Sequence, residues 1–517
     1  MTDTRYRIHQ IRIRPGEDPA VLPAKVAKAA RVRESEIRDL KIVRRSIDAR
    51  RKPDVFFVYS VDFSCSRKLK LPLAEDKVLP AVRHGSRAME GRPVIAGFGP
   101  CGMFAALTLA EQGYRPIVLE RGGPMDERVR KVERFWKDGT LDPECNVQFG
   151  EGGAGTFSDG KLTTGIHDPR IRHVLEVFVR CGAPEEILID QKPHIGTDKL
   201  RIVVRNVRRA VEDAGGEIRF HTRLAEVVRE DGNVTGVIAE GPDGRVRIPT
   251  EAVILAIGHS SRDTLRELRR EGIAMEQKPF SIGVRIEHPQ EMIDRAQYGE
   301  AAGSPDLPPA TYQLSWHVAD GRGVYTFCMC PGGRVITCSS EAGGVVTNGM
   351  SDYARDSGTA NSALLVDVRT TDFDDPDDPL SGVAFQERYE RLAFENGGGN
   401  YRPPRTVWGD FRDRKKAAEP VESSLPAFCS DAIREAMPHL GRKLKGFDRE
   451  DAVLTACETR SSSPVRILRD RKSLESLPGL YPGGEGAGYA GGIMSSACDG
   501  IRIAEKIIEA FAPPSRV

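Results

Sequence analysis

The pattern that most constrains this chain is a glycine-rich turn, GFGPCG at residues 97–102, placed between an apolar strand and an apolar helix. The strand is expected over residues 93–96 and the helix over residues 103–112. A second short strand over residues 116–119 is closed by Glu120. This order predicts a β-α-β unit of a parallel sheet, and therefore an α/β protein with a doubly wound, Rossmann-like domain.

Each glycine of the turn has its own steric role. Gly97 permits the tight turn, Gly99 removes a Cβ that would block a pyrophosphate, and Gly102 lets helix and strand pack closely. The helix N-terminus presents N–H groups to phosphates, and Glu120 can accept hydrogen bonds from a ribose diol. A plain tight turn is the alternative, and dinucleotide binding is favoured. The predicted cofactor-binding residues here are Gly97, Gly99, Pro100, Cys101, Gly102, Glu120 and Arg121.

A glycine-rich stretch near the other end of the chain favours FAD over NAD. Residues 483–492 read GGEGAGYAGG and open a helix expected over residues 493–510. An extended FAD needs a second anchor, and Glu485 could bond a ribityl hydroxyl. The helix N-terminus would favour the charge of a reduced flavin by roughly 0.3–2 kcal/mol. A loop that only caps a core helix is the alternative. The residues of this stretch predicted to contact FAD are Glu485, Gly486, Gly488, Gly491, Gly492 and Ile493, and two residues from earlier in the chain, Leu224 and Gly258, are predicted to join them.

A third glycine-rich loop, GEGGAGTFSDG at residues 150–160, can approach a pyrophosphate or flavin closely because most of its positions lack bulky side chains. Lys161 follows it, either as a cation near the flavin or as an ordinary surface lysine. The predicted cofactor-binding residues of this loop are Gly152, Gly153, Ala154, Gly155, Thr156, Ser158, Gly160 and Lys161.

Cys328 and Cys330 are the candidate catalytic thiols, with Lys161 as a candidate catalytic cation. On a regular strand, residues two apart face the same side. A disulfide between them is then geometrically poor, because their Cα atoms would lie near ~6.5–7 Å apart. Ordinary buried cysteines are the alternative. No metal is predicted, because Cys338 nearby does not complete a tetrahedral ligand set.

Several polar motifs have structural interpretations that we favour over functional ones. Arg460 and Arg466 flank three serines and could hold an anion, but ion pairs are favoured. His259, directly after the strand expected over residues 252–257, lies near the cofactor or only caps a loop. The acidic run at residues 372–378 lacks the spacing of a calcium loop and is expected to be a solvated loop.

Five longer segments resemble a bacterial family of FAD-dependent dehydrogenases. They are NVQFGEGGAGTFSDGKLTTG (146–165), KPFSIGVRIEHP (278–289), VYTFCMCPGG (324–333), ETRSSSPVRILRD (458–470) and YPGGEGAGYAGGIMSSACDGI (481–501). More distantly, the chain resembles glutathione-reductase-like flavoproteins with one dinucleotide fold and a separate substrate domain, a group that includes geranylgeranyl reductases and flavoenzymes that modify tRNA. The resemblance implies non-covalent FAD and a redox activity. Glu485 departs from the Asp usual in the wider group, which shifts its reach.

The N-terminal segment is expected to be a small, basic α/β module. Residues 1–92 hold 22 Lys and Arg against 12 Asp and Glu. A solvated basic face is one interpretation, and a surface for RNA, an acidic partner or another subunit is the other. The predicted domains are the module at 1–90, the first part of the FAD-binding domain at 91–270, an α+β substrate or cap domain at 271–478, and the C-terminal part of the FAD-binding domain at 479–517.

Composition narrows the class of protein. The chain has 517 residues with 39% hydrophobic side chains, a net charge of +1 and ten cysteines, which is sparse for a disulfide scaffold. It shows no signal peptide and no run long enough for a membrane span, so a cytoplasmic protein without membrane contact is expected.

The predicted function is FAD-dependent oxidoreduction of an unknown small molecule by hydride transfer at flavin N5. NADH or NADPH would bind only transiently as donor, since a second nucleotide turn is absent from the sequence. A flavin-dependent RNA-modifying enzyme and a non-catalytic flavin sensor are the alternatives.

Overall fold

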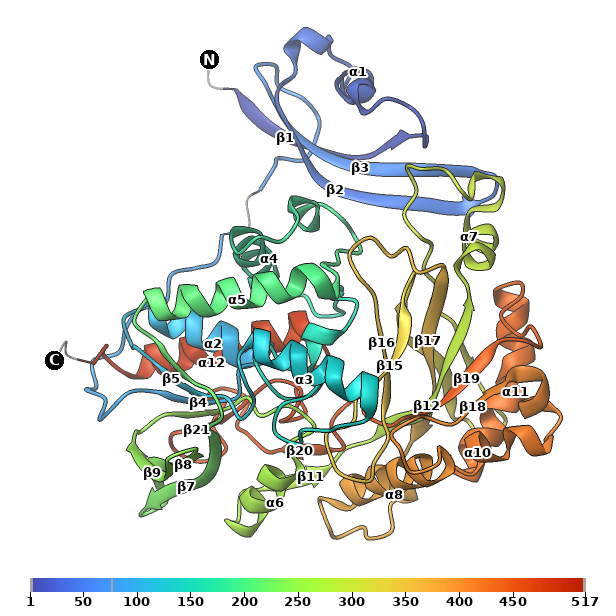
Figure 1. Ribbon diagram of the computed structural model, residues 1–517. Helices are drawn as coiled ribbons and strands as arrows, with labels where there is room; N and C mark the ends of the chain where they lie inside the picture. The colour runs from blue at the N-terminus through green and yellow to red at the C-terminus, as the bar shows by residue number, and fades with distance from the viewer. Residues whose placement is uncertain (1–2, 76–77, 515–517) are drawn as a thin grey trace.

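The computed structural model describes residues 3–75 and 78–514, and its central layer is a parallel sheet in the order β21-β10-β4-β5-β6 (Figure 1). From β4 the chain runs to β5 on one side, whereas β10 pairs with β4 on the other. The carboxyl ends of β4 and β10 therefore flank a topological switch point, where ligands of open α/β sheets bind. The strands are β4 (Val94–Ala96), β5 (Ile117–Leu119), β6 (Glu217–Arg219), β10 (Val253–Leu255) and β21 (Leu480–Pro482).

The two faces of this sheet are covered by different kinds of structure. Helices pack on one face, and the antiparallel sheet β7-β8-β9 packs on the other. The expectation of a doubly wound sheet, with helices on both faces, is wrong in this respect. On the second face the short strands β7, β8 and β9 take the place of a helical layer, and their residues Leu224, Val237 and Ile248 belong to the core under the parallel sheet. The covering elements are α2 (Pro100–Glu111), α4 (Arg170–Arg180), α5 (Thr197–Asp213), α12 (Ile493–Ala510), β7 (Arg223–Glu230), β8 (Asn233–Gly241) and β9 (Gly244–Pro249).

A second unit is built on an antiparallel sheet in the order β13-β14-β17-β12-β19-β18. In β12, Ile282, Val284 and Ile286 point into a core shared with α11, while Ser281 and Arg285 lie on the opposite face. The strands are β12 (Phe280–Pro289), β13 (Ser315–His317), β14 (Gly323–Cys330), β17 (Thr359–Val368), β18 (Arg405–Val407) and β19 (Val453–Glu458).

Helices and short strands complete this unit and its connections. The helices are α3 (Met125–Asp138), α6 (Arg262–Arg270), α7 (Gln290–Tyr298), α8 (Ser381–Asn396), α9 (Trp408–Arg412), α10 (Glu419–Glu422) and α11 (Ala427–Lys443). Two further strand pairs join β11 (Met275–Gln277) to β20 (Val465–Ile467) and β15 (Arg334–Thr337) to β16 (Thr347–Met350). The first pair links the segment after α6 to the segment that leads back to the parallel sheet.

The N-terminal module is an antiparallel sheet, β1-β3-β2, with α1 packed on it. Its β2 went unpredicted because it is highly charged and has no buried face. Arg45 of β2 forms an ion pair with Asp190, with Nε 2.7 Å from Oδ1, so the module contacts the unit built on the parallel sheet. The elements are β1 (Thr4–Ile13), α1 (Leu22–Ala30), β2 (Arg38–Arg51) and β3 (Asp54–Cys65).

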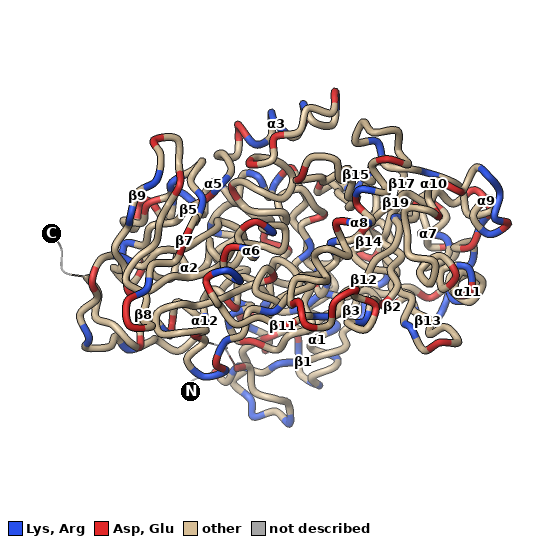
Figure 2. The backbone as a smooth tube through the Cα atoms, turned by 90° about the horizontal axis from the view of Figure 1, so that it is seen from below, with Lys and Arg blue, Asp and Glu red and all other residues tan. Residues whose placement is uncertain are grey.

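Several of the module's basic residues are paired with its own carboxylates. Arg7 with Asp62, Lys25 with Glu17, and Arg14 with Asp54 are among its ion pairs. Figure 2 shows acidic residues interspersed with basic ones over the whole molecule. RNA binding by the module stays a prediction.

Throughout residues 3–75 and 78–514, each helix is too short or too polar to cross a lipid bilayer.

Candidate functional site

The turn after β4 has the steric form that its sequence predicted. Gly97 has a φ of +100°, and a Cβ there would lie 2.4 Å from the carbonyl oxygen of Ala256. A Cβ on Gly102 would lie 1.9 Å from the oxygen of Gly97, so the helix and strand approach closely. Pro100 is the first residue of α2, where its missing N–H costs nothing. Cys101 is buried and faces α12, because a Cβ on Gly500 would meet its carbonyl oxygen at 2.1 Å.

The three glycine-rich loops converge at the carboxyl edge of the parallel sheet. A Cβ on Gly153 would lie 2.9 Å from the Cα of Gly99, so the middle loop lies directly on the first turn. A Cβ on Gly155 would lie 3.0 Å from Cγ1 of Ile493, the first residue of α12. Segments almost 400 residues apart thus form one surface that only glycine permits.

The end of β10 joins the same surface. A Cβ on Gly486 would lie 2.5 Å from the carbonyl carbon of Gly258. Gly258 and Gly492 have φ of +72° and +133°, and among the described residues an added Cβ at either would meet nothing within 4 Å. Gly491 is equally open. Gly258, Gly491 and Gly492 thus border an open space beside the close-packed loops, which we call the cradle, and side chains at these positions would fill it.

Glu120 is buried at the end of β5 and organises two of the loops. Its Oε2 accepts a hydrogen bond from Phe98 N, and its Oε1 accepts from Gly122 N and Gly150 N, each at 2.9 Å. A carboxylate has lone pairs beyond these three bonds, so it can still accept from a ribose hydroxyl.

Arg121 is held by protein partners. Its guanidinium forms ion pairs with Glu144 and Asp263, both at 2.9 Å, and its Cζ lies 4.2 Å from the centre of the Phe149 ring. The structure therefore shows Arg121 bracing the surface beside the turn, and its predicted contact with a cofactor stays a prediction.

The middle loop uses its own hydroxyls. Ser158 Oγ donates to the oxygen of Gly155 at 2.6 Å, and Thr156 Oγ1 donates to the oxygen of Glu151 at 3.4 Å. These bonds shape the loop, and its backbone is partly exposed at Gly153, Ala154 and Gly155. Gly152 and Gly160 are buried against Val204 and Gly196, and their predicted contact with a cofactor stays a prediction. Leu224 lies in β7 with its side chain in the core under the parallel sheet.

Glu485 and His259 face each other where β21 and β10 end. Their Oε1 and Nδ1 atoms are 3.7 Å apart. Burial raises the pKa of Glu485 to about 7 and lowers the pKa of His259 to about 3. His259 Nε2 is buried and has no hydrogen-bond partner in the described part of the chain. A buried unsatisfied nitrogen beside the cradle is what a polar ligand would satisfy. The open glycines, Glu120 and this nitrogen together fit an extended dinucleotide such as FAD.

Cys328 departs from the regular strand expected for it. Its φ is +44°, and the pairing of β14 with β17 shifts register between Phe327 and Cys330. A bulge, rather than an extended strand, therefore sets the spacing of the two cysteines, and both are free thiols.

The bulge brings the two thiols into contact. Cys330 Sγ donates to the carbonyl oxygen of Cys328 at 3.4 Å. Hydrogen bonding from the Cys330 thiol, followed by the positive charges of Lys161 and Arg285, holds the pKa of Cys328 well below its usual range. Lys161 and Cys328, predicted from separate motifs, are thus close enough to interact.

Arg285 is a site residue that the motifs did not reveal. It is fully buried in β12, and its Nη2 donates to Asn348 Oδ1 at 2.7 Å and to Glu458 Oε1 at 3.1 Å. Its one sequence signal is an arginine at the centre of the apolar strand FSIGVRIEHP.

The arginines beside the serine run are confirmed as ion-pairing residues. Arg460 Nη2 lies 2.8 Å from Glu390 Oε2, and Arg262 Nη2 lies 2.7 Å from Glu390 Oε1. Arg466 pairs with Glu276 at 2.8 Å. These contacts join α6, α8 and the segment after β19.

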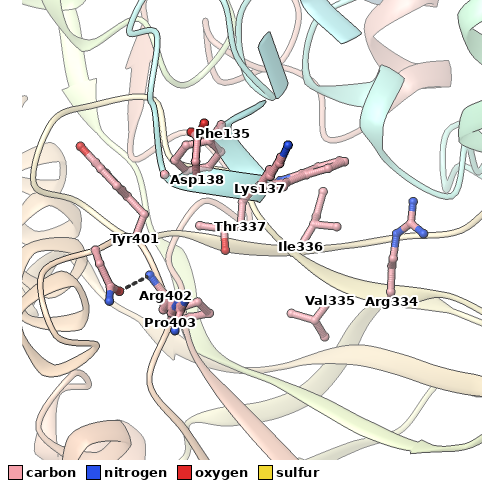
Figure 3. A pocket seen from close by; sticks show the side chains of 13 residues that line it. Phe135, Lys137, Asp138, Arg334, Val335, Ile336, Thr337, Tyr401, Arg402 and Pro403 are labelled. Atoms are coloured by element: carbon pink, nitrogen blue, oxygen red, sulfur yellow. Dashed lines mark hydrogen bonds between the residues drawn. The ribbon is translucent and has the colours of Figure 1, made fainter. Parts of the chain in front are cut away.

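A pocket of about 470 Å³ lies away from these loops, between the end of α3, β15 and the loop at residues 400–403. Figure 3 shows Arg334 and Tyr401 on its opposite sides and the hydrogen bond from Arg402 N to Asn400. The residues predicted as cofactor-binding or catalytic do not line it.

Two family matches accompany this geometry. Residues 279–461 match a family described as "FAD-dependent protein, C-terminal domain-like", which places the antiparallel unit among domains of FAD-dependent proteins. Residues 5–64 match a domain of unknown function, DUF8436.

One curated relative covers nearly the whole chain. It is a protein of Clostridium beijerinckii described as "Uncharacterized protein", 47% identical over 535 residues, which span 98% of this chain and 99% of the relative. The chain belongs to the same family as that protein.

Solved structures of low similarity include a flavin-dependent brominase (12% identity, 81% of this chain and 80% of that chain, TM-score 0.39). Another is a geranylgeranyl bacteriochlorophyll reductase-like protein from Thermoplasma acidophilum (13% identity, 82% of this chain and 79% of that chain, TM-score 0.36). A third is the FAD complex of glycerol-3-phosphate dehydrogenase from Bacillus halodurans (13% identity, 81% of this chain and 64% of that chain, TM-score 0.37). These likenesses are weak and carry no argument about this chain.

Proposed function

We propose that this protein is an FAD-dependent oxidoreductase. The observation that carries the proposal is the convergence of Gly99, Gly153 and Gly258 with the start of α12 on one open surface. The match of residues 279–461 to a domain of FAD-dependent proteins supports it independently.

The chain's own residues account for both ends of such a cofactor. The turn at residues 97–102 and the N-terminus of α2 bind the pyrophosphate, and Glu120 accepts from the ribose diol. Glu485 binds the ribityl chain, and the N-terminus of α12 stabilises negative charge on the ring. When bound, FAD supplies hydride transfer at its N5, and the protein supplies position and electrostatics.

Cys328 and Lys161 are the groups we assign to the reacting edge. Lys161 stabilises the Cys328 thiolate, and Cys330 donates a hydrogen bond to it. A thiolate beside a lysine can hold or accept a proton during oxidation of a substrate. NADH or NADPH is the proposed reductant, bound transiently.

The visible spectrum of freshly purified protein tests this proposal. Oxidised flavin absorbance and release of FAD on denaturation are expected, followed by anaerobic bleaching with NADH or NADPH. Colourless protein that takes up no added FAD would overturn the proposal. Yellow protein that no donor bleaches and no acceptor reoxidises would favour the flavin sensor.

A further inference from the structure

A pocket of about 540 Å³ lies against the antiparallel sheet, beside the loop that leads into α12. Residues of β12, β14 and β17 form one wall, and Ser461, Ser462 and Gly491 form part of the other. Its volume is within the roughly 300–1,000 Å³ of small-molecule sites. Because Gly491 stands two residues before α12, the pocket adjoins the proposed flavin cradle.

We propose that this pocket is the substrate site and that it takes a planar aromatic carboxylate. The inference rests on the proposed function and names the substrate class for it.

The first argument is a half-buried cation, Lys278, that has no ion pair among the described residues, although the carboxylate of Glu485 acts on its charge from beyond ion-pair distance. Lys278 Nζ donates to Ser462 Oγ at 2.7 Å and to the oxygen of Ser463 at 3.4 Å, and it forms no ion pair within the described residues. A partly buried ammonium is costly unless an anion joins it, and burial already lowers the pKa of Lys278.

A second cation stands at the pocket mouth. Arg369 Nη2 donates to the carbonyl oxygen of Asp320 at 3.1 Å, and no carboxylate pairs with it among residues 3–75 and 78–514. Asp367, the carboxylate of the lining, is already engaged, because it accepts from Ser281 Oγ at 3.3 Å and from Gly323 N at 2.9 Å. Neither Lys278 nor Arg369 forms an ion pair with Asp367 among the described residues, so both can still bind an anionic ligand.

The third argument is an aromatic wall. Phe327 is 40% exposed, and its ring meets that of Tyr325 edge-to-face, at 6.5 Å between centroids. Tyr325 is fixed, since its hydroxyl donates to Ser281 Oγ at 2.8 Å. A planar ring placed against Phe327 would cover exposed apolar surface with the geometry that aromatic pairs prefer.

Calorimetric titration of the holoprotein with benzoate tests the inference, with cyclohexanecarboxylate and benzamide as matched probes that lack the flat ring or the charge. Saturable benzoate binding is expected, about tenfold tighter than binding of either matched probe. Lys278→Gln should weaken benzoate about tenfold and remove its advantage over benzamide, and Lys278→Arg should restore it. Phe327→Ala should weaken benzoate more than cyclohexanecarboxylate.

Arg388→Gln is the control, because it removes an exposed arginine remote from the lining; it should bind benzoate like the wild type. Equal binding of benzoate and cyclohexanecarboxylate, or unchanged benzoate binding by folded Lys278→Gln, would overturn the inference. Flavin content is read in the same samples. Yellow protein that fails to bind benzoate overturns the substrate class alone, whereas colourless protein overturns the proposed function.

Discussion

Arg285 Nη1 donates a hydrogen bond of 2.9 Å to the carbonyl oxygen of Cys328. The same guanidinium is paired with the buried carboxylate of Glu458. This contact stabilises the bulge at Cys328, whose positive φ costs of order 1–3 kcal/mol by itself. A buried ion pair thus fixes the place of the thiol proposed to react.

The charge of Lys161 should govern the reactivity of that thiol. Because Lys161 helps to lower the pKa of Cys328, Lys161→Met should raise it and slow alkylation by iodoacetamide at pH 6 to 7. Peptide mass spectrometry of the alkylation rate against pH measures the shift. Lys506→Met, at an exposed position of α12, is the control. An unchanged profile in Lys161→Met would show that the lysine does not act on the thiol.

Contact between two glycines should control flavin retention. Gly153→Ala places a Cβ 2.9 Å from Gly99 Cα, whereas Gly232→Ala has a comparable φ of +81° but meets nothing within 4 Å among the described residues. Both variants carry the cost of a positive φ, about 1 kcal/mol. The ratio of flavin to protein absorbance should fall several-fold in Gly153→Ala alone. Equal loss in both variants would assign the effect to backbone strain.

The buried carboxylate of Glu390 should dominate the stability of the junction between the two larger units. Glu390→Ala removes the fully buried carboxylate that Arg262 and Arg460 share and leaves them mainly the partly exposed Glu341, at a cost of about 3–5 kcal/mol. Urea unfolding measures this against Glu267→Ala, which breaks an exposed pair with Arg270 and should cost under about 1 kcal/mol. The two arginines hold the pKa of Glu390 far below its usual range, so its contribution persists at mildly acidic pH and is lost only in strong acid. Equal costs in the two variants would contradict this ranking.

The protonation of Glu485 should make stability depend on pH. Its pKa is raised to about 7 by burial, so the folded state keeps a proton that the unfolded state releases above about pH 4.5. Wild-type stability should therefore fall, relative to Glu485→Gln, by up to about 1.4 kcal/mol per pH unit between about pH 4.5 and 7, and level off above.

His259 titrates in an overlapping range with the opposite slope, because its pKa is lowered to about 3. Both the wild type and Glu485→Gln contain His259, so its contribution cancels when the free energy of unfolding of one is subtracted from that of the other. Urea unfolding at four pH values between 5 and 8 measures this difference. A difference that stays constant with pH would show that Glu485 ionises normally.

The features predicted well from the sequence are local ones. The turn at residues 97–102 and the helix at 493–510 depend on glycine sterics and on apolar runs that are legible in a short window, and α12 has the predicted bounds. The prediction that Arg460 and Arg466 form ion pairs is also confirmed.

Features that depend on distant partners were missed. The layer β7-β8-β9 replaces expected helices because it packs on strands from several parts of the chain. The bulge at Cys328 arises where β14 meets β17, and Arg285 needs Glu458, 173 positions away, to be tolerated in a core. No local pattern in β14 predicts the bulge, and no local pattern in β12 predicts the pairing of Arg285 with Glu458.

The place of β21 and α12 has a consequence for biosynthesis. They supply an edge strand of the parallel sheet and the helix packed on α2, yet they are synthesised after the other strands of that sheet. A nascent chain lacking them would expose the apolar flank of β10 and offer only the diphosphate half of the cradle. Stable retention of the proposed coenzyme should therefore require α12 to have been synthesised and packed on α2, and a chain that stops before β21 would remain open to proteases.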